Sequence, residues 1–233
     1  YGMNENLELE IQVPFVWRGG GVLDSTIDGW HQTFGFPRGG RERLPEDEFQ
    51  YTVETDSDEV YSTTDSGWGL GNMEVGAKFL LDAGDHSSPA VSLVTTLSLP
   101  TANDGYGHEA VDYQVGLLAS KRWQPFTAYG GVGYTVLGSP NSGPLRFKRH
   151  NLSAFAFGEI ECGETISFLV GALAYSDLLD NAPTFPAYSV YLDTGFVVDL
   201  YQNLTLALML RENPAPRKGT TDVTFFSSIE AAF

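Results

Sequence analysis

Charged and amide side chains recur at every second residue of several segments, and they are the residues best placed to do chemistry. Glu8, Glu10 and Gln12 alternate with apolar residues, as do Glu74 and Lys78. Residues spaced by two in an extended strand point to the same face. Carboxylates on one face could favour cations along a hydrated path, or they could pair with basic neighbours. The candidates are Glu8, Glu10, Gln12, Arg18, Asn72, Glu74, Lys78, Asp112, Gln114, Tyr129, Asp193 and Arg211.

Two interpretations of this polar face stay open. In the first, Glu74, Asp112 or Asp193 pairs with Lys78 or Arg211, and the paired charges fill the space that the face encloses. In the second, the same side chains form the wall of a hydrated path that prefers cations. Both can hold in one molecule.

Catalytic and metal-binding patterns are weak in this sequence. The four histidines lie far apart and show no HExxH-like spacing. His150 and Ser153 form the nearest His–Ser pair, but they would point to opposite faces of one strand. Residues 56–59 (Asp-Ser-Asp-Glu) lack the Gly and the terminal Glu of an EF-hand loop. We therefore expect no enzyme activity, metal or cofactor, and we expect Cys162, the single cysteine, to be an inert thiol in a turn.

Period-two alternation predicts the elements that position these residues. Apolar residues occupy every second place from Leu7 to Trp17, and the same pattern recurs toward the C-terminus. The faces of the segments 149–161 and 165–176 stay ambiguous, because Phe155 and Phe157 oppose other apolar residues. The ten predicted strands cover residues 6–18, 69–81, 89–100, 110–123, 125–137, 149–161, 165–176, 187–199, 203–212 and 221–233.

The strands predict a single domain over residues 1–233, an all-β antiparallel transmembrane barrel of the outer-membrane type. Almost no helical sequence is available to cover so much apolar face, and a closed barrel with lipid outside and water inside needs no such cover. No run of about 18 apolar residues predicts a spanning helix. Aromatic residues at strand ends are candidates for interface girdles: Trp17, Trp68, Trp123, Phe126, Tyr188, Tyr201 and Phe233.

The connections between predicted strands alternate in length, which predicts an orientation. Short connections near 82–88 and 162–164 alternate with long ones such as 19–68 and 138–148. Outer-membrane barrels have short periplasmic turns and long extracellular loops. Both chain ends would then be periplasmic. The final alternating strand ends in Phe233, which resembles the assembly signal of bacterial outer-membrane barrels.

The net charge of −17 excludes nucleic-acid binding. Residues 19–68 hold eleven of the acidic residues against three arginines. This segment is either a solvated, repulsive surface loop, or it forms an acidic vestibule or a divalent-cation bridge to lipopolysaccharide. The expected partners are outer-membrane lipid, lipopolysaccharide and the barrel assembly machinery, together with an unidentified protein if the barrel serves as an anchor.

A short helix is predicted inside the 19–68 loop. Asp24 and the residues after it could cap it, and Gly35 and Pro37 would end it. Its residues Ile27, Trp30, His31 and Phe34 follow helical spacing and would share one face. That face could pack on the barrel rim or enter the lumen as a plug.

The same loop carries a family resemblance. Its motif resembles the first long loop of a family of Gram-negative outer-membrane proteins that is catalogued as a domain of unknown function. The resemblance implies an outer-membrane barrel without a known activity, and one further hairpin upstream of Tyr1-Gly2, which would make twelve strands. The matching parts are Arg18-Gly19-Gly20-Gly21, Leu23-Asp24, His31, Phe34-Gly35, Gly39-Gly40-Arg41 and Pro45-Glu46-Asp47.

Together these features predict a barrel in the bacterial outer membrane that passes small solutes or ions, with the 19–68 loop occluding or gating its charged lumen. The alternative is a non-conducting barrel that anchors a larger complex in that membrane.

Overall fold

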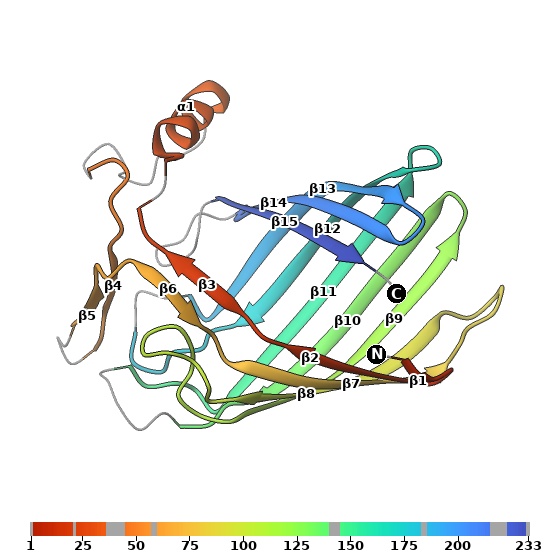
Figure 1. The fold of residues 1–233 in the computed structure, drawn as a ribbon, viewed down its shortest axis with the longest axis horizontal. Coiled ribbons are helices and arrows are strands. Elements are labelled where there is room, and N and C mark those ends of the chain that lie inside the picture. The colour runs from red at the N-terminus through yellow and green to blue at the C-terminus, as the bar shows by residue number, and fades with distance from the viewer. Residues whose placement is uncertain are drawn as a thin grey trace.

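The computed structural model describes residues 2–20, 22–35, 45–56, 60–139, 145–182, 186–214 and 223–231. Within these ranges the chain forms antiparallel strands and one α-helix (Figure 1). Eleven strands make one sheet, in the order β1 (Gly2–Asn4), β2 (Leu7–Gln12), β7 (Met73–Asp82), β8 (Ala90–Leu99), β9 (Asp112–Trp123), β10 (Phe126–Val136), β11 (His150–Glu161), β12 (Ile166–Ser176), β13 (Tyr188–Tyr201), β14 (Leu204–Glu212) and β15 (Val223–Ala231).

The all-β, antiparallel prediction is confirmed. Each of the ten predicted ranges overlaps one strand of this sheet, because alternating β-branched, aromatic and polar residues suit a sheet whose two faces differ. The eleventh strand, β1, was missed. It is three residues long and pairs with β2 across a turn at Glu5 and Asn6, which gives no period to detect.

The predicted strand 6–18 is two strands. After β2 the chain bends at Pro14 and resumes as β3 (Phe15–Arg18), which pairs with β6 (Gly67–Leu70) in a separate two-stranded sheet. Proline has no amide hydrogen to donate to a ladder. At this break the amide of Gly71 donates to the carbonyl oxygen of Pro14 at 2.8 Å, so the long hairpin continues beyond the main sheet.

The segment 19–68 also holds a hairpin that was not predicted from the sequence. Its strands are β4 (Tyr51–Glu54) and β5 (Val60–Thr63), which pair antiparallel. It docks on the connections after β10 and β12. Val53 is only 1% exposed, and the amide of Asp56 donates to the carbonyl oxygen of Asn181 at 2.8 Å. Arg146 adds an ion pair with Asp56 at 3.2 Å, so the hairpin is tied to the end of the sheet.

The predicted helix is present as α1 (Asp24–Phe34). Gly35 ends it with φ of 72°, a left-handed conformation that glycine adopts without strain. The capping prediction was wrong, because the N-cap is Leu23 and no side chain caps the helix. The carboxylate of Asp24 instead accepts a hydrogen bond from the amide of Asp47 at 2.8 Å, which joins the helix to a later part of the loop.

The main sheet is strongly rolled, so that β2 and β15 come to the same side of the molecule (Figure 1). Short connections follow β7, β9, β11 and β13, and longer ones join the opposite strand ends. Among the described residues, β15 pairs only with β14, and no pairing joins it to β1 or β2. The closed barrel of the sequence prediction is therefore not seen as a continuous hydrogen-bonded ladder. No helix in the described ranges is long and apolar enough to cross a membrane.

The turn after β7 is built around one carboxylate. Asp85 accepts hydrogen bonds from the amides and hydroxyls of Ser87 and Ser88, at 2.7 to 3.0 Å. The amide of Ser88, followed by the Ser87 hydroxyl, holds the pKa of the Asp85 carboxyl far below its usual range. The stabilisation is complete above the ordinary aspartate pKa of 3.8 and is lost only as the pH falls toward the lower folded value.

We therefore expect Asp85 to stay ionised at about pH 3, where an ordinary aspartate is mostly protonated. Carboxyl ¹³C NMR during an acid titration measures this directly, with exposed Asp104 as the reference residue. If the two carboxyl signals move together, the turn does not hold Asp85 as described.

Candidate functional site

The two faces of the main sheet differ sharply in chemistry. The register aligns Leu9, Ala77 and Thr95 on one face and Glu10, Gly76 and Thr96 on the other. Residues from β7 to β13 line a common hollow on the second face, so that face is concave. We call it the inner face and the first the outer face. Large apolar side chains are exposed across the outer face: Leu9, Ile11, Val75, Phe79, Leu97, Leu117, Val132, Leu152, Val170, Leu192, Phe196, Leu208 and Ile229.

Charges on the outer face are confined to the ends of the strands. Asp82 and Glu212 are the last residues of β7 and β14, and Lys121 is near the end of β9. Aromatic side chains follow the same ends. Tyr113, Tyr134 and Tyr188 are exposed near the long connections, and Trp123, Phe126 and Tyr201 near the short ones. A central apolar band thus lies between two aromatic borders.

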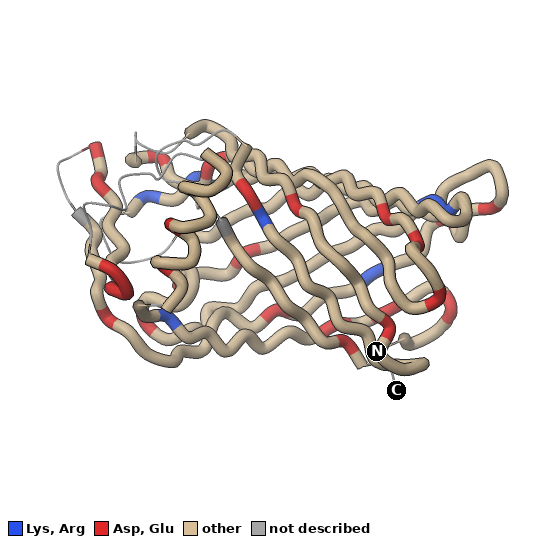
Figure 2. The backbone as a smooth tube through the Cα atoms, turned by 90° about the horizontal axis from the view of Figure 1, so that it is seen from above, with Lys and Arg blue, Asp and Glu red and all other residues tan. Residues whose placement is uncertain are grey.

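The inner face carries most of the charged strand residues, and several of them are paired. The ammonium group of Lys78 donates to Glu8 at 3.1 Å, and the hydroxyl of Tyr129 donates to Glu159 at 2.6 Å. In Figure 2, acidic segments outnumber basic ones over the whole tube. Glu10 and Glu74 make no ion pair within the described residues. The inner face therefore combines neutralised pairs with an acidic excess.

Asp193 and Arg211 form a pair that is joined by two hydrogen bonds. They face each other across β13 and β14, and Arg211 donates from Nε and Nη2 to the two carboxylate oxygens, at 2.8 Å each. Asp193 is 5% exposed. The guanidinium also lies 4.7 Å from the ring centre of Phe226 and 5.5 Å from that of Tyr191. Planar stacking and paired hydrogen bonds together fix the arginine against the wall.

Two hollows lie over the inner face. The upper hollow, at the long-connection end, has a volume of about 460 Å³ and includes Tyr51 of β4 together with Asn151, Tyr175, Tyr191 and Arg211. The lower hollow, toward the short turns, has a volume of about 550 Å³. It is lined by Lys78, Ser92, Tyr129 and Glu159, and by apolar residues of β9 and β11 to β13. Both volumes are typical of sites for small molecules.

Three residues predicted on the polar face instead anchor the long connections. Arg18 lies in β3, beyond the main sheet, where it donates to the carbonyl oxygens of Asp65 and Gly105 and stacks on Tyr106. The amide of Asn72 donates to the carbonyl oxygen of His108 at 2.7 Å. No local spacing points to these partners, because they lie in connections more than thirty residues away along the chain.

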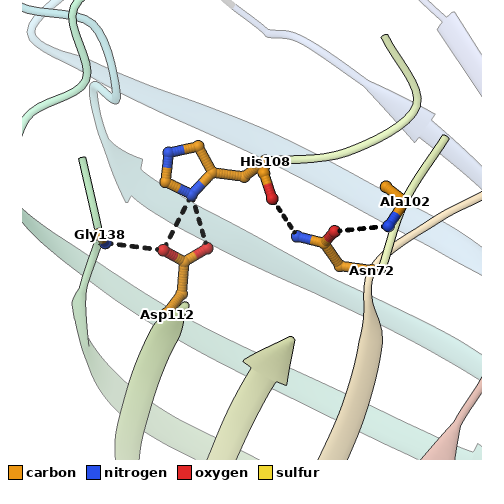
Figure 3. Close-up of polar contacts among 5 residues, drawn as sticks. All are labelled: Asn72, Ala102, His108, Asp112 and Gly138. Carbon is orange, nitrogen blue, oxygen red and sulfur yellow. Dashed lines mark hydrogen bonds and ion pairs between the residues drawn. The ribbon is translucent and has the colours of Figure 1, made fainter. Parts of the chain in front are cut away.

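Asp112 is the third, and Figure 3 shows its contacts. Its carboxylate accepts from Nδ1 of His108 at 2.9 Å and from the amide of Gly138 at 2.9 Å. The imidazole Nε2 is buried without a hydrogen-bond partner among the described residues, and its ring packs 4.7 Å from that of Phe147. This arrangement joins two connections to the start of β9. It resembles a structural contact more than a proton relay, since Nε2 has no hydrogen-bond partner among the described residues to pass a proton to.

Replacement of Asp112 by alanine is expected to lower the free energy of unfolding by about 1–3 kcal/mol, because two part-buried donors, His108 Nδ1 and the Gly138 amide, lose their acceptor. Urea unfolding followed by tryptophan fluorescence measures the loss, with the exposed Asp104→Ala variant as control. Equal midpoints for the two variants would show that these contacts contribute nothing to stability.

Helix α1 does not lie over the inner face. Its residues Leu23, Ile27, Trp30 and Phe34 line an apolar groove with Leu210 and Phe225, whose side chains belong to the outer face of β14 and β15. His31 is buried, and Asp24 makes the loop contact described above. The structure thus places the helix outside the rim. Among the described residues of segment 19–68, Tyr51 of the β4–β5 hairpin lines the upper hollow.

Other sequence predictions have simple outcomes. His150 lies on the outer face and contacts the Tyr134 hydroxyl at 2.6 Å, whereas Ser153 lies on the inner face. Cys162 is an exposed free thiol. Phe233 lies outside the described residues. In the described part of the chain, no group of three or more His, Cys, Asp or Glu side chains could hold a metal ion.

Comparison with known families gives one match over the full length. The family model described as "Protein of unknown function (DUF3187)" matches residues 1–233. Among curated proteins, none matches the chain.

Proposed function

We propose that this chain, which belongs to the DUF3187 family, forms a barrel in the bacterial outer membrane and passes small solutes or ions along its inner face. The observation that carries the proposal is the division of the sheet into two faces. The outer face is apolar and exposed over its centre, with charges only at strand ends. Exposing such a face to water costs free energy, whereas in a bilayer the same apolar face contacts the lipid chains.

Closure of the barrel joins the edge at β1 and β2 with the edge at β15. Both edges come to the same side of the rolled sheet (Figure 1). Direct pairing of these edges would close the described strands. In the proposed barrel, outer-membrane lipid and lipopolysaccharide surround the apolar outer face, and the barrel assembly machinery inserts the protein. We assign no catalytic step to the protein.

The inner face favours cations over anions. Lys78 and Arg211 are each neutralised by one acid, whereas Glu10 and Glu74 are left without an ion pair among the described residues. Carboxylates in a narrow, water-filled space raise the local concentration of cations. The β4–β5 hairpin narrows the extracellular mouth, because Tyr51 lines the upper hollow and Arg146 ties the hairpin down.

A non-conducting anchor is the second candidate. The Asp193–Arg211 pair and the docked hairpin both occupy space at the upper hollow, as expected of a barrel filled by its own side chains. In this case the exposed hairpin residues Thr52 and Ser62 would serve as part of the surface for a protein partner.

Single-channel conductance in planar bilayers separates the two candidates. We expect discrete steps with a cation preference, and larger or more frequent steps after deletion of residues 22–60, which removes the hairpin. The Glu10→Gln/Glu74→Gln variant should lose the preference, and Glu164→Gln, in a short turn, should keep it. Absence of steps from both the full chain and the deletion variant would refute a passage.

A further inference from the structure

The lower hollow has an apolar wall, which an ion path does not require. Five side chains supply it: Leu118 of β9, Phe155 and Phe157 of β11, Leu169 of β12 and Val197 of β13. These residues explain why the faces of β11 and β12 were ambiguous in the sequence. Both faces of these two strands carry large apolar side chains, since Leu152 and Val170 lie on the outer face.

The aromatic rings of this wall lie flat on glycines. Phe155 is paired with Gly131 of β10, and Phe157 with Gly171 of β12. A Cβ atom on Gly131 would overlap the ring of Phe155, and one on Gly171 would overlap the ring of Phe157. The two rings therefore extend sideways over neighbouring strands, with centres 6.0 Å apart, and do not project into the hollow.

This packing keeps the hollow open while making its wall apolar. Rings that only filled a narrow barrel would project inward and occupy the volume, as side chains do in small closed barrels. Here about 550 Å³ remains beside them. An apolar surface held open to water gains free energy when an apolar ligand displaces that water.

Polar groups border the apolar wall on one side. The hydrogen-bonded Tyr129 and Glu159 line the same hollow, together with Ser92 and Lys78, whose ammonium group is paired with Glu8. The ionic groups already satisfy one another, so a charged ligand would gain little from them. A hydroxyl or amine can share their hydrogen bonds without breaking either pair.

An apolar track connects this hollow with the upper one. The inner-facing residues of β12 run from Tyr175 through Leu173 and Gly171 to Leu169. Tyr175 lines the upper hollow and Leu169 the lower one. A hydrophobic ligand that moves along β12 therefore passes Leu173 and the Phe157 ring over Gly171, beside the paired Asp193 of β13.

We propose that the lower hollow binds an uncharged small molecule with a hydrophobic body and one hydrogen-bonding end, such as an aromatic alcohol. This inference rests on the proposed function, because it specifies the solute class for which the passage is built. The hydrophobic body lies against Phe155, Phe157 and Leu169, and the polar end reaches Tyr129 and Glu159.

The test is equilibrium dialysis of naphthol against the purified full chain in detergent micelles, with empty micelles subtracted. We expect one saturable site. Gly171→Val should weaken binding at least about tenfold, because its side chain drives the Phe157 ring into the hollow. Gly158→Val is the matched control, since Gly158 lies on the outer face of the adjacent strand with open space at its Cβ position. Leu169→Gln provides a second inner-face variant if Gly171→Val does not fold.

The outcomes separate this inference from the proposed function. Absence of saturable binding, or equal binding by the Gly171→Val and Gly158→Val variants, would overturn the inference even if the protein conducts. Saturable binding that depends on Gly171 in a protein without conductance would uphold the site and reject the passage.

Discussion

Replacement of Asp193 by alanine is expected to lower the free energy of unfolding by about 3–5 kcal/mol. The substitution leaves the guanidinium of Arg211 without the two carboxylate oxygens that it contacts at 2.8 Å. Arg211 remains between the rings of Tyr191 and Phe226, where water cannot fully replace the lost acceptor. The loss should appear as a lower urea midpoint in detergent micelles.

Two controls identify the cause of this loss. Adding Arg211→Met to the Asp193→Ala variant should restore most of the stability, because it removes the uncompensated charge. Glu8→Ala should cost less than about 1 kcal/mol, since Glu8 and Lys78 form a comparable pair with side chains 54% and 49% exposed. Equal losses of unfolding free energy for Asp193→Ala and Glu8→Ala would contradict the claim that burial makes the Asp193–Arg211 pair the stronger of the two.

Arginine in place of Leu117 is expected to cost about 2–4 kcal/mol when the protein folds into a bilayer. Leu117 lies near the middle of β9 on the outer face, and 46% of its surface is exposed. The proposed barrel places this side chain in the hydrocarbon region, where a guanidinium must distort the bilayer to keep water. Urea titration of the protein folded into lipid vesicles measures the difference.

Gln114→Arg is the control for this prediction, because Gln114 lies on the inner face of the same strand. We expect it to cost less than about 1 kcal/mol, since the proposed lumen is hydrated. Equal costs for the two arginine variants would mean that the two faces of β9 meet similar surroundings.

Alternation in the sequence was sufficient to locate the main sheet. From β7 to β15 each strand has an apolar outer face over nine residues or more, so a shift of one residue would turn these apolar side chains to the inner face. The break at Pro14 was visible in principle, because proline seldom continues a ladder. The three-residue strand β1 and the β4–β5 hairpin were too short to show a period.

Contacts between distant residues limited the prediction of the site. Asp193 and Arg211 were both candidates for pairing, and the register of β13 and β14 brings them opposite each other. Lys78 pairs with Glu8, which the sequence did not single out as its partner. Asp112, Asn72 and Arg18 were placed on the polar face by spacing alone. Their loop partners depend on how residues 101–109 fold back, which no local pattern encodes.

The ambiguous strands β11 and β12 turned out to be informative. Their apolar residues fall on both faces, which a period-two pattern cannot assign. The glycines opposite Phe155 and Phe157 were the missing signal, because a bulky residue paired with glycine can lie flat on the sheet. Sequence spacing gives no access to such pairs until the register is known.

The central claim is that the outer face contacts lipid and the inner face contacts water. Nitroxide labels placed one at a time along residues 128–135 of β10, in lipid vesicles, test it most directly by their accessibility to oxygen and to a water-soluble nickel complex. We predict period-two alternation, with oxygen favoured at Val132 and Tyr134 and the nickel complex favoured at Thr135 and Gly133. Equal accessibility at neighbouring positions, or the opposite phase, would contradict the account.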